Sequence, residues 1–265
     1  MNNVGYKFQV SSIRLKSNWF DVNGKYSKMK HEAFDIYINL FRFKIDVEEY
    51  DNYFQVDISD LRQVTGYSKQ VIYESIKTLC TLKVIKVLNV TRWDRFLTPD
   101  KKIPNYHTLK IVAIDTPQLE RVDIENGVKD SPLSSDDYYV AADLEMYTYY
   151  KNNELTIKHY ALYCLMRKLS NHVERKAYMA IEKMGKCLGI HPDVVNKMVH
   201  EMNRKYVLFS TYNNNGKGGL MFEHVVLRNL AHLESLMRAY KESNDRNIKK
   251  WDKKLSRKNN KQKDG

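Results

Sequence analysis

The sequence has few of the residues that mark metal-binding and secreted proteins. Its 265 residues include three widely separated cysteines and eight histidines scattered without ligand spacing. Zinc sites and disulfide frameworks both need such residues at characteristic spacings, so neither is predicted. We expect Cys80, Cys164 and Cys187 to be small core residues in a reducing compartment, and we expect no bound metal or cofactor.

The motifs of enzymes that act on DNA are missing as well. There is no Gly-x-x-x-x-Gly-Lys-Ser/Thr phosphate loop, and no His-x-His pair precedes a candidate tyrosine nucleophile. No stretch approaches the roughly 18 uninterrupted apolar residues of a membrane helix, and Met1 to Phe8 has no apolar signal core. We therefore expect a cytoplasmic protein that is not an enzyme.

Positive charge is abundant but unevenly distributed. Lysine and arginine number 44 against 32 acidic residues, which gives a net charge of +12. Residues 1–114 carry 18 basic and 12 acidic side chains, 115–145 carry 2 and 9, 146–244 carry 15 and 8, and 245–265 carry 9 and 3. The acidic stretch also contains Pro117 and Pro132, so it predicts a linker between two basic domains.

The first basic block has the element order of a winged helix-turn-helix. The spacing of apolar residues predicts a helix over 31–44, a strand over 53–58 and a short helix capped by Ser59. Gly66 suits a tight turn between helices, and Ser68 can cap the next helix. Two β-branched runs, 84–90 and 108–114, then predict a β-hairpin, or wing, around a basic loop.

The second basic block repeats this order. Helices are predicted over 156–172 and 178–188, Gly189 supplies the turn, and Pro192 suits the first position of a third helix. Strands over 206–211 and 220–226 flank a glycine-rich loop. A shift of 123 residues superimposes the turn glycines and matches apolar positions in both halves, which favours two copies of one architecture.

The predicted fold is thus α+β and mainly helical, with two winged helix-turn-helix domains in tandem. The predicted parts are a winged-helix domain 1–114, an acidic linker 115–145, a second winged-helix domain 146–226, and a C-terminal helix with a basic tail 227–265.

The first recognition helix supplies the best candidates for base contacts in a major groove. Its outward face is predicted to carry Ser68, Lys69, Gln70, Tyr73 and Lys77. Gln70 suits a bidentate contact to adenine, Lys69 a guanine or a phosphate, and Tyr73 a thymine methyl group or a phosphate. The wing offers Arg92, Arg95, Lys101 and Lys102 around Trp93, which would clamp phosphates or enter a minor groove.

The second recognition helix is less basic. Its outward residues are predicted to include Asn196, Lys197, His200 and Arg204, but Asp193 and Glu201 lie on the same helix. It would therefore either read bases or pack against a protein partner. Lys217 in the second wing lies among glycines whose N–H groups could approach a phosphate closely.

The C-terminal segment has an apolar repeat with two interpretations. Its apolar residues recur at spacings of three and four, namely Val226, Leu230, Leu233, Met237, Tyr240, Ile248, Trp251 and Leu255. This pattern predicts either a short coiled coil that joins two protomers into a homodimer or a helix that packs on its own domain. The basic tail beyond it suits a nonspecific grip on DNA or RNA.

A family resemblance covers Arg14 to Val90, roughly a third of the chain. The residues that carry it are Leu15-Lys16-Ser17-Asn18-Trp19-Phe20, the run from Tyr26 to Tyr37, and Thr65-Gly66-Tyr67-Ser68-Lys69-Gln70-Val71-Ile72-Tyr73. This stretch resembles the N-terminal winged helix of plasmid and phage replication initiators and of DnaD-like primosome proteins from low-GC Gram-positive bacteria. The resemblance implies binding to a replication origin and recruitment of host replication proteins. The second half shows no DnaD-type C-terminal motif and is closer in outline to the tandem winged-helix layout of plasmid initiators.

We therefore predict a sequence-specific, nucleoid-associated, double-stranded DNA-binding protein of a phage or plasmid, acting in replication initiation at an origin. One alternative is a transcriptional regulator of a mobile element, either a repressor or an activator. A further alternative is a protein-interaction adaptor whose winged helices do not bind DNA. An initiator would bind iterated sites, whereas a repressor would occupy one or two operators and oligomerise through the C-terminal helix.

Overall fold

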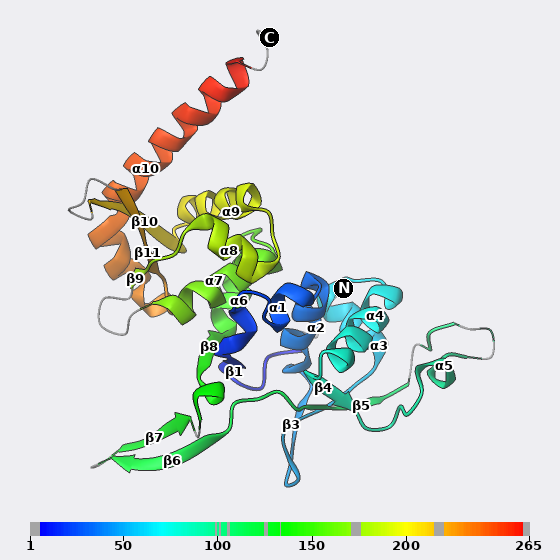
Figure 1. Ribbon diagram of the computed structural model, residues 1–265. Helices are drawn as coiled ribbons and strands as arrows, with labels where there is room; N and C mark the ends of the chain where they lie inside the picture. Colours follow the sequence, from blue (N-terminus) through cyan, green and yellow to red (C-terminus); the bar gives the residue numbers. More distant parts are fainter. Residues whose placement is uncertain are drawn as a thin grey trace. The chain divides into compact units, whose positions relative to one another are not determined.

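The computed structural model describes residues 6–98, 100, 102–104, 107–124, 127–132, 134–170, 176–214 and 220–261. The chain divides into two compact units, Met1–Leu144 and Glu145–Gly265, and both combine helices with antiparallel strands (Figure 1). Within the described residues, no helix combines the length and apolar character that a bilayer crossing requires. The α+β class predicted from the sequence is confirmed, with helix predominating.

Unit 1 is built around one helix that is buried on all sides. Every residue of α2 from Ala33 to Leu40 is buried, including the polar Asp35 and Asn39. The helices of this unit are η1 (Ser17–Phe20), α1 (Lys25–Lys28), α2 (His31–Leu40), α3 (Ile58–Thr65), α4 (Lys69–Thr81), α5 (Trp93–Phe96) and η2 (Ser135–Asp137). The predicted helix 31–44 is therefore shorter, because the chain turns at Phe41 to Phe43 and enters a strand at Lys44.

Unit 1 also contains a four-stranded antiparallel sheet, in the order β2-β3-β5-β4. The strands of unit 1 are β1 (Ser12–Lys16), β2 (Lys44–Val47), β3 (Tyr50–Val56), β4 (Ile85–Val87), β5 (Leu109–Ala113), β6 (Leu119–Ile124), β7 (Gly127–Pro132) and β8 (Tyr139–Asp143). The predicted wing strands do pair, from Ile85 opposite Ala113 to Val87 opposite Ile111, but they are shorter than predicted. Strand β2 was not predicted from the sequence.

The acidic stretch 115–145 is not a free linker, because it is folded into unit 1. Strand β8 pairs with β1 along its whole length, from Ser12 opposite Asp143 to Lys16 opposite Tyr139. Asp115 accepts hydrogen bonds from Trp19 Nε1 at 2.6 Å and Lys25 Nζ at 2.5 Å. Asp115, one of the acidic residues that suggested a tether, thus pairs with Lys25 of the same unit.

A second acidic residue of this stretch is bound in the same way. Asp137 accepts a hydrogen bond from the backbone N–H of Gln118 at 2.9 Å and another from the Ser134 hydroxyl at 2.7 Å, and it lies 3.2 Å from Lys16 Nζ. These contacts, led by the Gln118 N–H, lower the pKa of the Asp137 carboxyl. Asp137 therefore stays ionised and fixes the chain just before β8.

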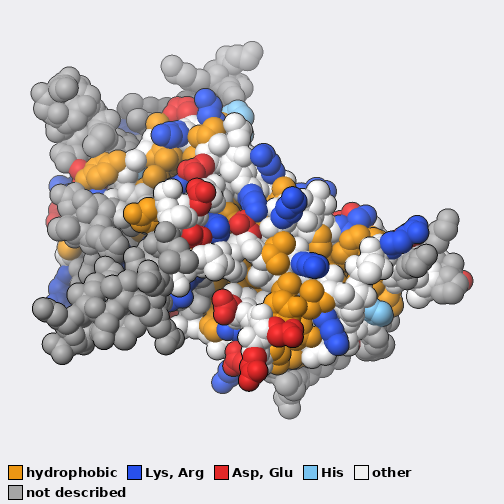
Figure 2. Space-filling view, turned by 60° about the horizontal axis from the view of Figure 1, so that its bottom comes forward, with side chains coloured by type: hydrophobic (Ala, Val, Ile, Leu, Met, Phe, Trp, Pro, Cys, Tyr) orange, Lys and Arg blue, Asp and Glu red, His pale blue; other side chains and the backbone are white. Residues whose placement is uncertain are grey.

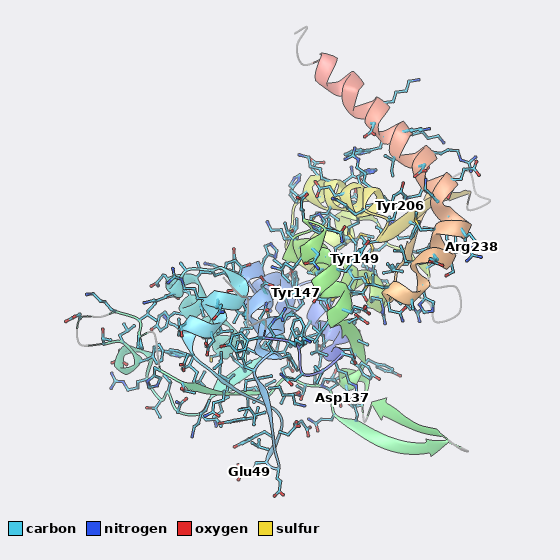
Figure 3. All side chains as sticks on the ribbon, turned by 180° about the vertical axis from the view of Figure 1, so that it is seen from behind. Glu49, Asp137, Tyr147, Tyr149, Tyr206 and Arg238 are labelled. Carbon is cyan, nitrogen blue, oxygen red and sulfur yellow. The ribbon has the colours of Figure 1, made fainter. Side chains whose placement is uncertain are left out.

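Unit 2 begins directly with α6 (Leu144–Asn152), a helix that the sequence reading missed. It brings Tyr147 and Tyr150 onto Tyr160 of the next helix at ring distances of 5.2 and 5.9 Å (Figure 3 labels Tyr147). The further elements are α7 (Ile157–Leu169), β9 (Lys176–Ala177), α8 (Ile181–Leu188), α9 (Pro192–Arg204), β10 (Leu208–Asn214), β11 (Leu220–Val226), η3 (Leu230–His232) and α10 (Leu233–Lys261). The sheet order is β10-β11-β9.

Both predicted turn glycines occupy bends between successive helices. Gly66 follows α3 with φ 76°, and Gly189 follows α8 with φ 64°. A side chain is strained in this left-handed region, so glycine is the favoured residue at both points. Ser68 caps α4 and Pro192 opens α9, as predicted. The predicted cap Ser59 is wrong, because Asp57 caps α3 and forms a reciprocal capping box with Asp60.

A buried polar network fastens α10 to its own unit. Asn203 Nδ2 donates to Ser210 Oγ at 2.9 Å, and Ser210 Oγ lies 2.9 Å from His224 Nδ1. From α10, Asn244 Nδ2 donates to the Asn203 carbonyl oxygen at 2.9 Å. Nearby, the Tyr206 hydroxyl donates to Asp245 at 3.0 Å (Figure 3). Of the two interpretations of the C-terminal repeat, these contacts match the helix that packs on its own domain. Val226 and Leu230 lie outside α10.

Candidate nucleic-acid interface

The α3–α4 turn of unit 1 holds the N-terminal end of α4 in a fixed position. The Tyr67 hydroxyl donates to the buried Asp35 of α2 at 2.9 Å, which ties the turn to the central helix. The Ser68 hydroxyl accepts from the Val71 backbone N–H at 3.3 Å and caps α4. Burial and the Asp35 carboxylate raise the pKa of the Tyr67 hydroxyl, so this donor stays protonated. The spacing of residues in the sequence did not predict that Tyr67 and Asp35 position this helix.

The first turn of α4 faces solvent. Ser68 and Gln70 are exposed, and Lys69 is half-buried. Within the part of the chain that the structure describes, Lys69 has no carboxylate oxygen within 4 Å. A cation without a carboxylate partner and a neutral amide therefore stand at the positive end of a helix dipole, where an anion is favoured.

One acidic residue moderates the charge of the next turn. Glu74 accepts a hydrogen bond from Gln70 Nε2 at 3.1 Å and lies 3.6 Å from Lys77 Nζ. Such solvent-facing pairs on one helix contribute only about 0.2 to 0.5 kcal/mol each. Gln70 and Lys77 are thus held loosely and can exchange Glu74 for another partner at small cost.

Tyr73 is not an outward residue, which corrects the prediction that it contacts DNA. Its side chain is buried, and its ring stacks on Phe96 at 6.0 Å and meets Trp93 edge-on at 5.5 Å. Its hydroxyl donates to the Trp93 carbonyl oxygen at 3.3 Å. The reason is α5, a short helix inside the predicted wing loop, whose two aromatic residues cover this side of α4. Tyr73 therefore positions the wing loop.

The described cations of the wing loop each have an acidic neighbour. Arg92 donates to both oxygens of Asp94, at 3.2 and 2.8 Å, and Lys102 Nζ lies 3.9 Å from Asp100. All four side chains are at least 60% exposed, so these pairs contribute little stability. Lys101 and the side chain of Arg95 lie outside the described residues. The prediction of cations in this loop is confirmed for Arg92 and Lys102, but it did not take into account the acidic residues two positions away from each of them.

The β2–β3 hairpin has the opposite character. Ile45, Val47 and Tyr50 are 40%, 37% and 37% exposed, and the acidic residues Asp46, Glu48, Glu49 and Asp51 surround them. Figure 3 places Glu49 at the tip of the hairpin, and Figure 2 shows hydrophobic and acidic side chains close together on the face from which it projects. A phosphate backbone would be repelled here, so this hairpin is an unfavourable surface for DNA.

The predicted recognition helix of unit 2 is open at one end and covered at the other. Asn196 and Lys197 are exposed, as predicted. His200 is buried instead: its ring stacks on Trp251 of α10 at 3.9 Å. Arg204 forms an ion pair with Asp252, and its guanidinium lies 4.7 Å from the centre of the Trp251 ring. The prediction that His200 faces outward is therefore wrong. Arg204 is exposed as predicted, although its guanidinium is engaged by α10. Lys217 lies outside the described residues.

Packing against α10 also removes the charge of His200. Burial and the neighbouring Arg204 lower the pKa of His200 to about 4, although Asp252 acts in the opposite direction. At neutral pH the imidazole is neutral and offers no positive charge to a phosphate. The sequence pattern identified Trp251 as an apolar position, but it could not show which surface that position covers.

Glu201, the acidic residue that cast doubt on α9, is held by unit 2. Thr156 donates its backbone N–H to His159 Nδ1 at 3.0 Å, so the proton of this neutral ring lies on Nε2. Nε2 lies 2.7 Å from Glu201 Oε2 and therefore donates to it. Burial lowers the pKa of His159 despite this carboxylate. Glu201 thus has a structural role at the side of α9.

The structure offers little for metal or thiol chemistry in its described part. No group of three or more His, Cys, Asp or Glu side chains there is arranged to hold a metal ion. Cys164 and Cys187 are buried, as predicted for core residues, whereas Cys80 is only half-buried. Burial raises the pKa of Cys80 to about 11 and raises that of Cys164 as well, so both thiols are protonated at neutral pH.

Comparison with known proteins gives weak structural likenesses. No protein-family model matches the sequence, and a search of curated proteins finds no match. A possible transcriptional regulator from Methanosarcina mazei Go1 aligns over 54% of this chain and 96% of its own, with 13% identity and a TM-score of 0.25. The Pi initiator protein, solved in complex with iteron DNA, aligns over 83% of this chain and 98% of its own, with 14% identity and a TM-score of 0.39. Both TM-scores are too low to establish a shared fold.

Proposed function

We propose that the chain binds double-stranded DNA sequence-specifically through two winged helix-turn-helix domains, and that it acts by binding rather than by catalysis. The observation that carries this proposal is the first turn of α4. It is fixed by a left-handed glycine and the Tyr67–Asp35 bond, capped by Ser68, and presented to solvent with Lys69 and Gln70. A helix end of this kind can enter a major groove.

Each candidate contact residue has a defined part in this proposal. Gln70 exchanges Glu74 for the edge of an adenine, where an amide can donate and accept at once. Lys69 contacts a guanine or a phosphate, and Lys77 a phosphate. In the wing loop, Arg92 and Lys102 exchange Asp94 and Asp100 for backbone phosphates, which are stronger partners for a cation than exposed carboxylates. In unit 2, Asn196 and Lys197 remain available for DNA.

We further propose that the bound DNA is a replication origin of a phage or plasmid. The support is the resemblance of residues 14–90 to the winged helix of replication initiators, in which Gly66-Tyr67-Ser68 opens the recognition helix. Mapping the bound sites on the DNA of the source element by footprinting tests this point. Clustered, repeated sites within an origin are expected. One or two sites overlapping a promoter would replace the initiator by a transcriptional regulator.

The binding surface is tested by fluorescence anisotropy on the bound site with three single variants. Gln70→Ala should lower affinity for the cognate site by about 1 to 3 kcal/mol and relax the choice of one base pair. If Lys69 contacts a guanine, Lys69→Ala should lower affinity for the cognate site and relax the choice of one base pair. If Lys69 contacts a phosphate, the variant should weaken binding to all duplexes alike. Arg92→Ala should weaken all duplexes alike and lower the salt dependence.

The matched control is Lys28→Ala, which removes an exposed lysine of α1 in the same unit. Its affinity for DNA should equal that of the unaltered protein. If Lys69→Ala, Gln70→Ala and Arg92→Ala all bind the specific site as tightly as Lys28→Ala does, α4 is not a recognition helix. The protein-interaction adaptor would then be the better description.

A further inference from the structure

The distal half of α10 is the most basic segment of the protein. Residues 246–261 contain eight lysines and arginines and one acidic residue, Asp252. Lys249, Lys250 and Lys253 are exposed, and none has a carboxylate oxygen within 4 Å among the residues whose side chains are described. The single acidic residue is already engaged by Arg204 of α9. Arg246 lies 3.9 Å from Glu242. The segment therefore carries a concentrated positive charge, of which Lys249, Lys250 and Lys253 have no carboxylate neighbour among the described side chains.

This basic segment is held against the outward side of α9. Trp251 supplies the contact: it stacks on His200 at 3.9 Å and lies under the guanidinium of Arg204 at 4.7 Å. In Figure 1 the C-terminal part of α10 projects past the other elements of unit 2. The charges are thus carried by a helix that contacts α9 at His200 and Arg204.

The contact face and the basic face lie on opposite sides of the helix. Ile248, Trp251 and Leu255 follow a spacing of three and four residues, which keeps them on one side. Arg246, Lys250 and Lys253 follow the same spacing but are offset by half a turn, and the sequence continues their row at Arg257 and Lys261. Docking through Trp251 therefore turns the basic row away from unit 2.

We propose that α10 from Arg246 to Lys261 is a DNA-backbone-binding element, docked by Trp251 so that α9 and α10 form one continuous surface. The inference rests on the proposed function and adds a contact site to it. It also gives a reason for the burial of His200 and the pairing of Arg204 with Asp252: the lysines of α10 supply the positive charge at that end of α9.

The sign of the charge decides between this role and two others. A helix that blocked DNA from α9 would be expected to carry negative charge, but this segment has seven more basic than acidic residues. A helix that bound a membrane surface would need an exposed apolar face, whereas Trp251 is packed on His200. Phosphates of a nucleic acid match both the charge and the polar, outward row.

The test compares two double variants of the full chain. Lys250→Gln with Lys253→Gln removes two charges from the basic row, and Lys183→Gln with Lys186→Gln removes two exposed charges from α8. Binding of both to a short duplex of unrelated sequence is measured by anisotropy over a range of salt concentrations. Each phosphate contact contributes about 0.9 to the log–log salt slope. The α10 variant should therefore lose about 1.8 in slope and, by the same relation, about 30-fold in affinity near 0.15 M salt.

Each outcome has a defined meaning. Loss of slope and affinity in the α10 variant, with the α8 variant unchanged, supports the proposal. Equal behaviour of the two variants overturns it, and tighter DNA binding by the α10 variant replaces it by a blocking role for α10. Loss of binding to phosphatidylserine vesicles, with DNA binding unchanged, reassigns the segment to a membrane. If Lys69→Ala weakens the specific site while the α10 variant does not, this inference fails and the proposed function stands. If the unaltered protein binds no duplex, both fail.

Discussion

Acidification should destabilise unit 2 through His224, a fully buried histidine in strand β11. Its Nδ1 lies 2.9 Å from Ser210 Oγ, and burial, aided by the nearby His200, lowers its pKa to about 4. The unfolded chain binds this proton near its ordinary pKa of about 6.5, whereas the folded chain does not. The stabilising effect is therefore fully present above about pH 6.5 and is lost as the pH falls toward 4. The difference of about 2.5 pKa units corresponds to about 3 kcal/mol.

Hydrogen exchange of the β10 and β11 backbone amides, followed in urea, measures this loss in unit 2 alone. The free energy of opening should fall between about pH 6.5 and pH 4, and His200 and His159, whose pKa values are also lowered, add to the decrease. His224→Gln keeps a hydrogen-bonding side chain without a titrating ring. It should lose about 3 kcal/mol less than the unaltered protein over the same range. Identical pH profiles for the two proteins would refute the reasoning.

Substitutions at three positions of unit 1 test its internal contacts by urea unfolding. Tyr73→Ala should lower the free energy of unfolding by about 3 to 5 kcal/mol because it removes a buried ring. Tyr73→Phe should lower it by about 1 kcal/mol and leave DNA affinity unchanged. If Tyr73→Phe weakened DNA binding, the Tyr73 hydroxyl would be a DNA contact after all. Asp115→Asn should cost about 1.5 to 3 kcal/mol through its bonds to Trp19 and Lys25, and an unchanged stability would show that this end of the acidic stretch is free. Gly66→Ala should cost about 1 to 2 kcal/mol at φ 76°, where nothing lies within 4 Å of the added carbon, so a neutral effect would contradict the left-handed turn.

The features predicted correctly from the sequence are those determined by a few neighbouring residues. Gly66 and Gly189 mark left-handed turns, Ser68 marks a helix start, and Pro192 marks a first helical position. Each depends on the backbone preference of one residue type, which acts whatever surrounds it. The pairing of the wing strands was also predicted, because β-branched residues favour strands and two such runs on either side of a loop favour a hairpin.

The errors arose where distant segments meet. Acidic residues and prolines in 115–145 suggested a tether, but their partners are Lys16, Trp19 and Lys25, about a hundred positions earlier in the chain. Spacing placed Ile72, Ile76 and Leu79 correctly in the core of unit 1. It could not show that a helix inside the wing loop would cover Tyr73, because nothing in α4 encodes that neighbour.

The candidate site was affected by the same limit. Gln70 is exposed as predicted and Lys69 is half-buried, since both precede the part of α4 that other elements cover. His200 and Arg204 had suitable spacing and chemistry, but α10 lies against them from about fifty residues further along the sequence. A periodic pattern gives the buried side of a helix; it does not reveal a second element that lies on its outer side.

The antiparallel ladder between β1 and β8 sets when unit 1 can be completed during synthesis. Ser12 to Lys16 leave the ribosome early, but their hydrogen-bonding partners follow only with Tyr139 to Asp143. Until then the first strand has an open edge, and until Asp115 has been made Trp19 lacks its carboxylate partner. Because chains grow by about 5 to 20 residues per second, this waiting time lasts on the order of ten seconds. A nascent chain that stops at residue 114 should therefore expose a sticky edge strand, which chaperones or a second chain would be free to cover.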